Sequence, residues 1–292
     1  MKSMPFSFLE EFQDLKPLNP EIFPPENLQV SLIIPAKKSG HALERSVRQI
    51  HDFLHARYPD AFEIILVPNP NPGDPEDPSL EIATEMSRRY AAVRTVPHSE
   101  PKGKGAAVRT GVVHARGKWI FLTDADLPYD LDFFDRAAHQ LQSGFDLVSG
   151  NRRLASSYFH VPVRLLPLAF GRHRLGLGFN FFVRTLLGIQ TTDTQAGIKA
   201  LSRRLAQASF FRQCCPGFLF DLEIFLTARG HRYSQIALPV VLHLNDEKST
   251  VRILKESVLV AFWLNRILWR KMQKIYDSRK KQKGPHSDIL TP

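Results

Sequence analysis

Short apolar runs alternate with longer segments of helical periodicity from residue 30 to residue 149. Val30–Pro35 and Phe62–Val67 are short and rich in β-branched residues, which is typical of buried strands. Between them, residues 42–57 repeat Leu and Val at the spacing of one helix face. Further strands are predicted at 93–96, 119–122 and 146–149, and further helices at 79–90, 102–115 and 131–141. This alternation predicts an α/β fold with a mostly parallel sheet and helices on both faces.

The run from Trp119 to Asp126 ends in two aspartates one residue apart, Asp124 and Asp126. On an extended segment, carboxylates at i and i+2 point to the same side. They repel each other unless a cation lies between them, and hard oxygen ligands suit Mg²⁺ or Mn²⁺. The alternative is a strand end followed by an aspartate-rich loop.

A glycine-rich turn, Lys102-Gly-Lys-Gly-Ala-Ala, precedes this strand and runs into a helix. Glycines allow the backbone to approach an anion, and a helix N-terminus offers unpaired N–H groups. We expect Lys104 to reach a diphosphate here. The spacing is not that of a Walker A loop, and a solvated basic turn is the alternative.

The net charge of +10 is unevenly distributed. No Asp or Glu occurs from Leu147 to Thr192, whereas six arginines do, and residues 266–283 are basic as well. Basic surfaces serve nucleic acid, anionic lipid or phosphorylated substrates. Because arginine is mixed here with bulky apolar residues and no nucleic-acid motif is present, we expect an anionic membrane surface and no nucleic acid as partner.

We expect one large domain with short flanking segments. Residues 1–28 are predicted to be an extension, partly helical from Phe8 to Leu15, and 29–255 the α/β domain. Residues 256–278 are predicted to form an amphipathic helix, and 279–292 a basic, disordered tail. The start lacks a signal-peptide pattern and no run reaches about 18 apolar residues, so we expect a cytoplasmic protein, peripheral at the inner face of the membrane. Cys214 and Cys215 are adjacent, which predicts packing rather than a disulfide or zinc site.

The predicted C-terminal helix, Ser257–Tyr276, carries an apolar stripe beside a basic face. Such a helix can lie on an anionic membrane. The alternative is a helix that packs on the core or on a second copy of the chain. The basic residues of this helix are Arg266, Arg270, Lys271 and Lys274.

Seven short motifs of the chain resemble motifs that family 2 glycosyltransferases with the GT-A fold carry in the same order, especially the polyprenyl-phosphate sugar synthases. The resemblance runs from about residue 29 to residue 255. The motifs are Ser31–Ala36, Gly103–Gly111, Thr123–Leu127, Gly150–Arg152, Asp193–Lys199, Phe220–Glu223 and Asp246–Ser249.

Two departures from the family pattern fall in the pocket for the nucleobase and ribose. Residues 37–40 read Lys-Lys-Ser-Gly where the family has Asn-Glu soon after the first strand. Residues 68–74 replace an Asp-Asp-Gly-Ser segment whose aspartate holds the base. We expect Asn69 to contact a base and Lys37 or Lys38 a phosphate. The donor is therefore unusual, weakly bound, or no longer used.

The resemblance implies an inverting transfer from a nucleotide-diphosphate sugar that depends on Mg²⁺ or Mn²⁺. Asp124 and Asp126 would hold the ion, or Asp126 the ion and Asp124 the ribose or sugar, with Lys104 on the diphosphate. A phosphate acceptor has a second pKa of about 6 and needs positioning cations rather than a base. A hydroxyl acceptor would need a base.

The expected residues follow from these roles. Catalytic residues are Asp126, Asp193 and Asp221; nucleotide-sugar contacts are Pro35, Ala36, Lys38, Asn69, Lys104 and Asp124; acceptor-phosphate contacts are Arg152, Arg153 and Lys248. Structural alternatives stay open. Asp221 and Glu223 could instead cap a helix or form a salt bridge. Asp193 could be the N-cap residue before a turn, and Arg152 could pair with a nearby acid.

Three functions compete at this point: an active polyprenyl-phosphate glycosyltransferase, a soluble glycosyltransferase acting on a sugar or small-molecule hydroxyl, and a degenerate, non-catalytic GT-A protein that binds a membrane or partner. The altered base pocket favours the last, and Asp124, Asp126 and Lys104 oppose it. The donor sugar, the base, the acceptor and the oligomeric state do not follow from the sequence.

Overall fold

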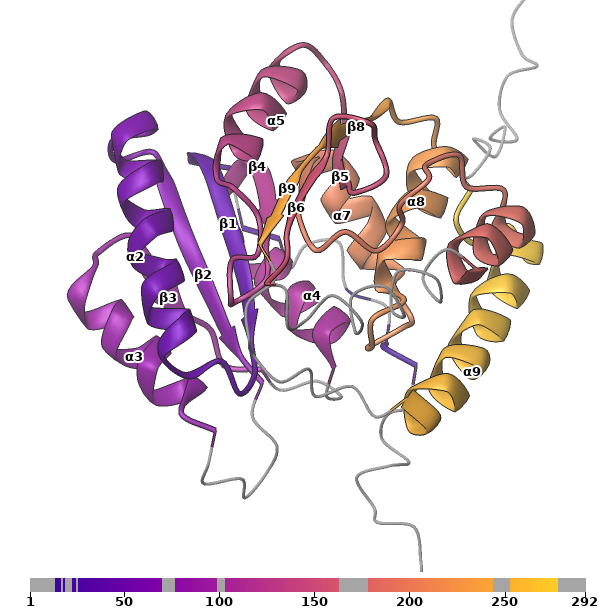
Figure 1. Cartoon of the computed structure of the whole chain (residues 1–292), viewed down its shortest axis with the longest axis horizontal. Helices are drawn as coiled ribbons and strands as arrows, with labels where there is room; N and C mark the ends of the chain where they lie inside the picture. The colour runs from indigo at the N-terminus through magenta and orange to yellow at the C-terminus, as the bar shows by residue number, and fades with distance from the viewer. Residues whose placement is uncertain are drawn as a thin grey trace, which may run out of the picture.

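The computed structural model describes residues 14–16, 18, 23–24, 26–69, 77–98, 103–162, 178–243 and 253–277 (Figure 1). Every strand and helix predicted between residues 30 and 149 is confirmed, with ends shifted by a few residues. These elements are β1 (Leu28–Ala36), α2 (Gly40–Arg57), β2 (Phe62–Pro68), α3 (Ser79–Arg89), β3 (Val93–Thr95), α4 (Lys104–His114), β4 (Gly117–Leu122), α5 (Asp132–Gln142) and β5 (Leu147–Asn151).

The second half of the chain, for which the sequence pattern was unclear, adds shorter elements. They are β6 (Tyr158–His160), a helix over 178–187, β7 (Lys199–Ser202), α7 (Arg203–Phe211), α8 (Phe220–Gly230), β8 (Gln235–Pro239), β9 (Val241–His243) and α9 (Ile253–Met272).

Within the described residues, a seven-stranded sheet has the order β3-β2-β1-β4-β7-β5-β8. All neighbours are parallel except β7, which runs antiparallel to both β4 and β5. The predicted fold class is thereby confirmed. The reversal of β7 matters for function, because its first residue, Lys199, lies opposite Leu122 at the end of β4 and opposite Ser149 in β5.

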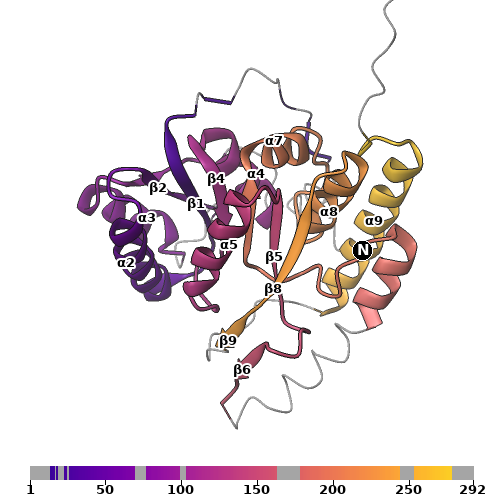
Figure 2. The same ribbon diagram turned by 90° about the horizontal axis from the view of Figure 1, so that it is seen from above.

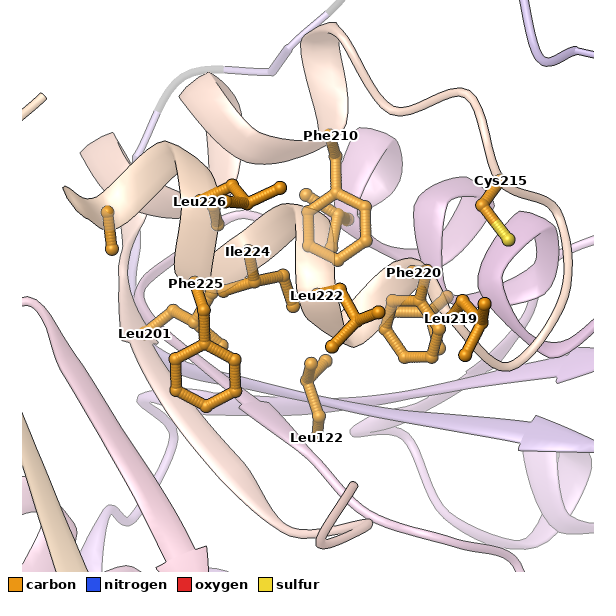
Figure 3. Packing of buried hydrophobic residues seen from close by; sticks show 14 of the residues in the cluster. Leu122, Leu201, Phe210, Cys215, Leu219, Phe220, Leu222, Ile224, Phe225 and Leu226 are labelled. Atoms are coloured by element: carbon orange, nitrogen blue, oxygen red, sulfur yellow. The ribbon is translucent and has the colours of Figure 1, made fainter. Parts of the chain in front are cut away.

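Helices cover both faces of the sheet, and a hydrophobic core fills each side (Figure 2). The alternation of side chains along β1 explains why: Leu32 and Ile34 point into the core beneath α2, α3 and α5, while Ile33 points into the core beneath α4, α7 and α8. In the second core, Phe210, Phe220 and Phe225 pack around the strand residues Leu122 and Leu201 (Figure 3).

A small parallel sheet of β6 and β9 lies beside the main one (Figure 2). It is joined to the segment after Asp126 by a bridge between Tyr129 and Leu242 and by the bond from His243 N–H to the Pro128 carbonyl, 2.8 Å. The short sheet therefore holds the segment that follows the two aspartates.

The predicted C-terminal helix is present, but the middle of its apolar stripe faces the protein. Trp263, Leu264 and Ile267 are buried in the core, and the Tyr276 hydroxyl after the helix donates to Glu223 Oε1, 2.8 Å. The basic face is also partly engaged, since Arg266 pairs with Asp14. The alternative of a helix packed on the core thus holds for this stripe.

No helix in the described part of the chain is both long and apolar enough to cross a membrane. Residues 1–13, 17, 19–22 and 25 of the predicted extension, with most of the predicted helix from Phe8 to Leu15, lie outside the described residues, as does the predicted tail, 279–292. Cys214 and Cys215 are buried, free thiols, as their spacing predicted. Their backbone N–H groups donate to Glu223, and burial raises the pKa of both thiols.

Candidate active site

The predicted site residues gather at one edge of the main sheet. β1, β2 and β4 end there, α4 begins there, and the antiparallel β7 starts there. In open α/β sheets the crevice beyond the carboxyl ends of the strands is the usual ligand site. Asp124 follows β4, Lys104 begins α4, and Arg152 follows β5, so three different connections contribute to the same place.

Lys104 and Asp124 form an ion pair at this edge. Burial acts to lower the pKa of Lys104, but the charges of Asp124 and Asp221 outweigh it and raise this pKa, so the ammonium stays protonated. Gly197 lies directly against Asp124: a Cβ on Gly197 would collide with the carboxylate. The absence of a side chain at residue 197 therefore sets where the Asp124 carboxylate can lie.

Behind Lys104 a second ion pair is fully enclosed. Lys199 Nζ lies 2.9 Å from Asp221 Oδ1, and both side chains are buried. Burial raises the pKa of Asp221, against the lowering effects of Lys199 and Lys104. The four charges thus alternate in sign through Asp124, Lys104, Asp221 and Lys199. An aspartate held in this way is an ion-pair partner, which is the structural alternative that the sequence left open.

Arg152 and Asp193 form a fork-shaped ion pair. Arg152 Nε and Nη2 donate to Asp193 Oδ2 and Oδ1 at 2.7 and 2.8 Å, and the Arg152 backbone N–H adds a bond of 3.0 Å to Oδ2. Burial acts to raise the pKa of Asp193, but the bonds and charge of Arg152 lower it. Such two-bonded pairs are stronger and more directional than a single contact.

The loop that carries Asp193 is anchored by the helix over 178–187. Asn180 Oδ1 accepts from the Thr194 backbone N–H at 3.2 Å and from its hydroxyl at 2.8 Å. Both residues are buried. The position of the Arg152 partner therefore depends on a helix that sequence reasoning did not predict.

Tyr129 lies between the two charged groups. Its hydroxyl accepts the Gly197 N–H at 3.3 Å, and burial raises the pKa of Tyr129 to about 12. The charges of Arg152 and Asp124 both act on the pKa of this phenol, so both lie near it. Nothing in the sequence pattern singled out Tyr129, whose backbone is held by an isolated bridge to Leu242.

Asp126 is half-exposed, and it lies with Asp124 in a turn closed by the hydrogen bond from the Leu127 N–H to the Asp124 carbonyl, 3.1 Å, rather than on the extended segment that the sequence predicted. Among the described residues, no group of three or more His, Cys, Asp or Glu side chains is arranged to hold a metal ion. Mg²⁺ bound with substrate phosphates needs only one or two protein carboxylates, because phosphate and water oxygens complete the shell. The donor set of Asp124 and Asp126 fits such a phosphate-bridged ion and does not fit an all-protein metal cage.

At the start of α4, Gly103 and Gly105 lie against protein backbone, whereas the sequence suggested that they approach an anion. A Cβ on Gly103 would collide with the Pro216 backbone, and one on Gly105 would lie 2.7 Å from the Gly217 carbonyl. Asn69 Nδ2 donates to the Gly103 carbonyl at 3.2 Å. These residues pack the turn against residues 216–217, and that packing sets the direction in which Lys104 projects.

Asp77 was missed by sequence reasoning, because it follows the unusual proline-rich segment. It is buried, and its Oδ1 accepts the backbone N–H groups of Lys38 and Ser79, both at 3.0 Å. Its Oδ2 is buried with no hydrogen-bond partner among the described residues. Lys38 has a positive φ of 53° and an exposed side chain. Asp77 thus brings a carboxylate to the edge where Pro35 and Ala36 end β1.

The remaining predicted contacts are less closely tied to the cluster. Arg153 is half-buried and its backbone N–H donates to Asn151 Oδ1 at 2.9 Å. Burial lowers the pKa of Arg153. Lys248 and its motif lie outside the described residues. Glu223, the last residue of the Phe220–Glu223 motif, is committed to Cys214, Cys215 and Tyr276.

Comparison with known proteins agrees with this geometry. The family model for glycosyl transferase family 2 matches residues 31–210. A dolichyl-phosphate beta-glucosyltransferase of Trichomonas vaginalis is 26% identical over 264 residues, 86% of this chain and 76% of the relative. The Saccharomyces cerevisiae protein of the same name is 27% identical over 227 residues, 75% of this chain and 68% of the relative.

Among solved structures, glucosyl-3-phosphoglycerate synthase of Mycobacterium tuberculosis is similar in fold. Its complex with phosphoglyceric acid superposes with a TM-score of 0.55 at 17% identity and covers 82% of this chain and 80% of that one. Its complex with Mn²⁺ and uridine-diphosphate-glucose gives 0.55 at 15% identity, over 86% of this chain and 80% of that one. Since the family model spans more than half of the sequence, the chain belongs to glycosyl transferase family 2 and is a glycosyltransferase of the GT-A fold.

Proposed function

We propose that the chain transfers a sugar, with inversion, from a nucleotide-diphosphate sugar to a polyprenyl phosphate at a membrane surface. The observation that supports the proposal is that the Lys104–Asp124 ion pair and Arg152 lie close to each other and to Tyr129. Lys104 and Asp124 would bind the diphosphate of the donor, and Arg152 would bind the phosphate of the acceptor. The names of the dolichyl-phosphate relatives support the lipid acceptor and favour glucose as the sugar.

On the donor side, Asp124 and Asp126 would hold Mg²⁺ or Mn²⁺, which would neutralise charge on the departing diphosphate. Lys104 is protonated and paired with Asp124. When the donor binds, the Lys104 ammonium group would also contact the diphosphate and stabilise the negative charge there. The charge of Asp221 helps to keep Lys104 protonated. Asp77 Oδ2 is buried with no hydrogen-bond partner among the described residues, and it would take the base-binding role of the aspartate in the family's Asp-Asp-Gly-Ser segment.

On the acceptor side, Arg152 would hold the phosphate. Asp193 engages its Nε and Nη2, and Nη1 lies outside that pair. A phosphate acceptor is ionised and needs no strong base, which agrees with Asp193 and Asp221 each being committed to a cation. We therefore propose positioning roles for both aspartates. Arg153 and Lys248 would supply further positive charge to the acceptor.

Donor binding is tested by thermal unfolding of the chain with UDP-, GDP-, CMP- and dTDP-linked ligands, each with Mn²⁺ and with EDTA. The proposal expects one nucleotide class to raise the melting temperature with Mn²⁺ and to lose most of that effect with EDTA. A chain that no nucleotide stabilises under either condition would instead be a degenerate member of the family.

A further inference from the structure

Two neighbouring helices expose large apolar side chains at the end of the molecule opposite α2 and α3. In the helix over 178–187, Val183 and Leu187 are buried, whereas Phe181, Phe182 and Leu186 are exposed. Figures 1 and 2 both place this helix beside α9, and Lys271 Nζ of α9 donates to the Leu186 carbonyl at 3.1 Å. The two helices are therefore in contact near their C-terminal halves.

α9 is apolar on two sides. Its inward side, with Trp263, Leu264 and Ile267, completes the core. Its outward residues follow at intervals of three, four or seven, the spacing of a single helix stripe, and are exposed. They are Val258, Phe262, Trp269 and Met272. We use the term two-helix face for these four residues together with Phe181, Phe182 and Leu186.

Positive charge predominates around the two-helix face. Residues 178–187 and 258–276 contain no Asp or Glu and carry five Lys and Arg side chains. Arg184 and Lys271 donate to the carbonyls of Gln190 and Leu186, contacts that leave their positive charge unbalanced by an acid. Exposed apolar and aromatic side chains bordered by unbalanced positive charge match the apolar interior and anionic headgroups of a lipid bilayer.

The two-helix face is also connected to the acceptor side of the site. The helix over 178–187 presents Phe181 and Phe182 outward, and the adjacent Asn180 holds Thr194 inside. Thr194 follows Asp193, the partner of Arg152. Contact of the two-helix face with a bilayer would therefore place the acceptor-phosphate arginine at a fixed position relative to the headgroup layer.

We propose that the two-helix face inserts its apolar side chains into the interfacial layer of an anionic membrane and so orients the site toward a lipid-bound acceptor. The orienting role rests on the proposed function; the binding itself does not. The sequence-based expectation gave the membrane contact to the arginine-rich stretch from Leu147 to Thr192 and to the whole stripe of the C-terminal helix. This assignment differs from it, because Trp263 and Ile267 of that stripe are buried.

The matched test uses the full chain and vesicles of mixed phosphatidylcholine and phosphatidylglycerol. The variant Phe181→Gln/Met272→Gln changes two exposed side chains, and Leu80→Gln changes another exposed apolar side chain on the distant α3. We expect the double variant to lose at least about tenfold in vesicle sedimentation, since each apolar side chain of this size contributes substantially when buried. Leu80→Gln should bind as the unchanged chain does.

Trp269 provides a direct readout of insertion. Of the three tryptophans, Trp119 and Trp263 are buried and Trp269 is 45% exposed. Brominated lipids should quench its fluorescence, and Trp269→Phe should abolish the quenching. Quenching that persists in Trp269→Phe would overturn the proposal. Vesicle binding by the double variant that equals binding by the unchanged chain would also overturn it. So would a dimeric unchanged chain that binds no vesicles, together with a double variant that is monomeric, because the two-helix face would then be a dimer interface.

Activity in detergent separates this proposal from the proposed function. With a detergent-dispersed polyprenyl phosphate, Phe181→Gln/Met272→Gln should transfer as the unchanged chain does, and the difference should appear only on vesicles. The unchanged chain could bind vesicles through Trp269 and yet transfer no sugar to a lipid phosphate, whether this is dispersed in detergent or held in vesicles. In that case the proposed acceptor is wrong, and the proposed membrane contact stands.

Discussion

Arg152 and Asp193, separated by 41 residues, are joined by two parallel hydrogen bonds of 2.7 and 2.8 Å. No acid lies near Arg152 in the sequence, yet the fold brings Asp193 to it on a loop anchored by Asn180. This pair gives the arginine one orientation, which is what recognition of a phosphate requires.

Arg152→Lys should reduce transfer to a polyprenyl phosphate far more than it reduces donor binding. An ammonium cannot make the fork to Asp193, and hydrogen bonds to charged groups contribute about 1.5–3 kcal/mol, so we expect a loss of about tenfold or more in transfer rate. Calorimetry with the donor and a transfer assay measure the two effects. If donor affinity falls and the rate at saturation is normal, Arg152 belongs to the nucleotide site.

Asp221→Asn should destabilise the protein while leaving the shape of its pH–rate profile unchanged. The substitution strands the buried Lys199 ammonium, and breaking a buried pair costs about 3–5 kcal/mol. Denaturant unfolding measures this loss, and the second variant Asp221→Asn/Lys199→Met should recover part of it because the stranded charge is gone. Loss of the acidic limb of the pH profile in Asp221→Asn would identify this residue as a base after all.

Gly197→Ala should impair metal-dependent nucleotide binding in a folded protein. The new Cβ collides with the Asp124 carboxylate, which must move, and a shift of about 1 Å in a site costs on the order of a hundredfold. Gly178→Ala is the matched control, because a Cβ there meets nothing within 4 Å. Calorimetry with a nucleoside diphosphate and Mn²⁺ compares them; equal affinity in both variants would mean that the position of Asp124 does not matter.

Glu63→Gln should remove part of the acid sensitivity of folding. Burial acts to raise the pKa of Glu63, but bonds from Ser31, Arg116 and Arg94 outweigh it and lower this pKa. The folded pKa therefore lies below the unfolded value of about 4.3, so the stabilisation is complete above that pH and is lost as the pH falls through the folded pKa.

The Glu63 prediction is measured by melting temperatures across the acid range. Glu63→Gln should be less stable at neutral pH and should lose less stability on acidification than the unchanged chain. Glu85→Gln is the control, because its 4.0 Å pair with Arg88 is exposed. Parallel curves for the unchanged chain and Glu63→Gln would contradict the assignment.

The half of the fold up to β5 could be predicted because each element has a local pattern. β1 and β2 are apolar runs, and α2 repeats its buried residues at helical spacing. β7 could not be predicted, because its four residues begin with Lys199. This lysine is buried, and its charge is balanced by an ion pair with Asp221. A long-range pair of this kind leaves no local signal.

The site shows the same division. Asp124, Lys104 and Arg152 could be found from short motifs, but the pairing of their side chains could not. Asp193 was expected as a base and lies in an ion pair with Arg152, and Gly103 and Gly105 at the start of α4 pack against Pro216 and Gly217. Motifs identify which residues matter, whereas the contacts among them depend on how separate segments of the chain come together.

The central claim is tested most directly by offering both acceptors to the chain in one reaction. Labelled UDP-glucose and Mn²⁺ are incubated with a dispersed polyprenyl phosphate and with 3-phosphoglycerate, using the unchanged chain and Asp124→Asn, and the lipid and aqueous phases are counted separately. We predict that label enters the lipid phase with the unchanged chain and that Asp124→Asn transfers none above background. Label that appears only in a phosphoglycerate product, or in neither acceptor with any nucleotide sugar, would contradict the account.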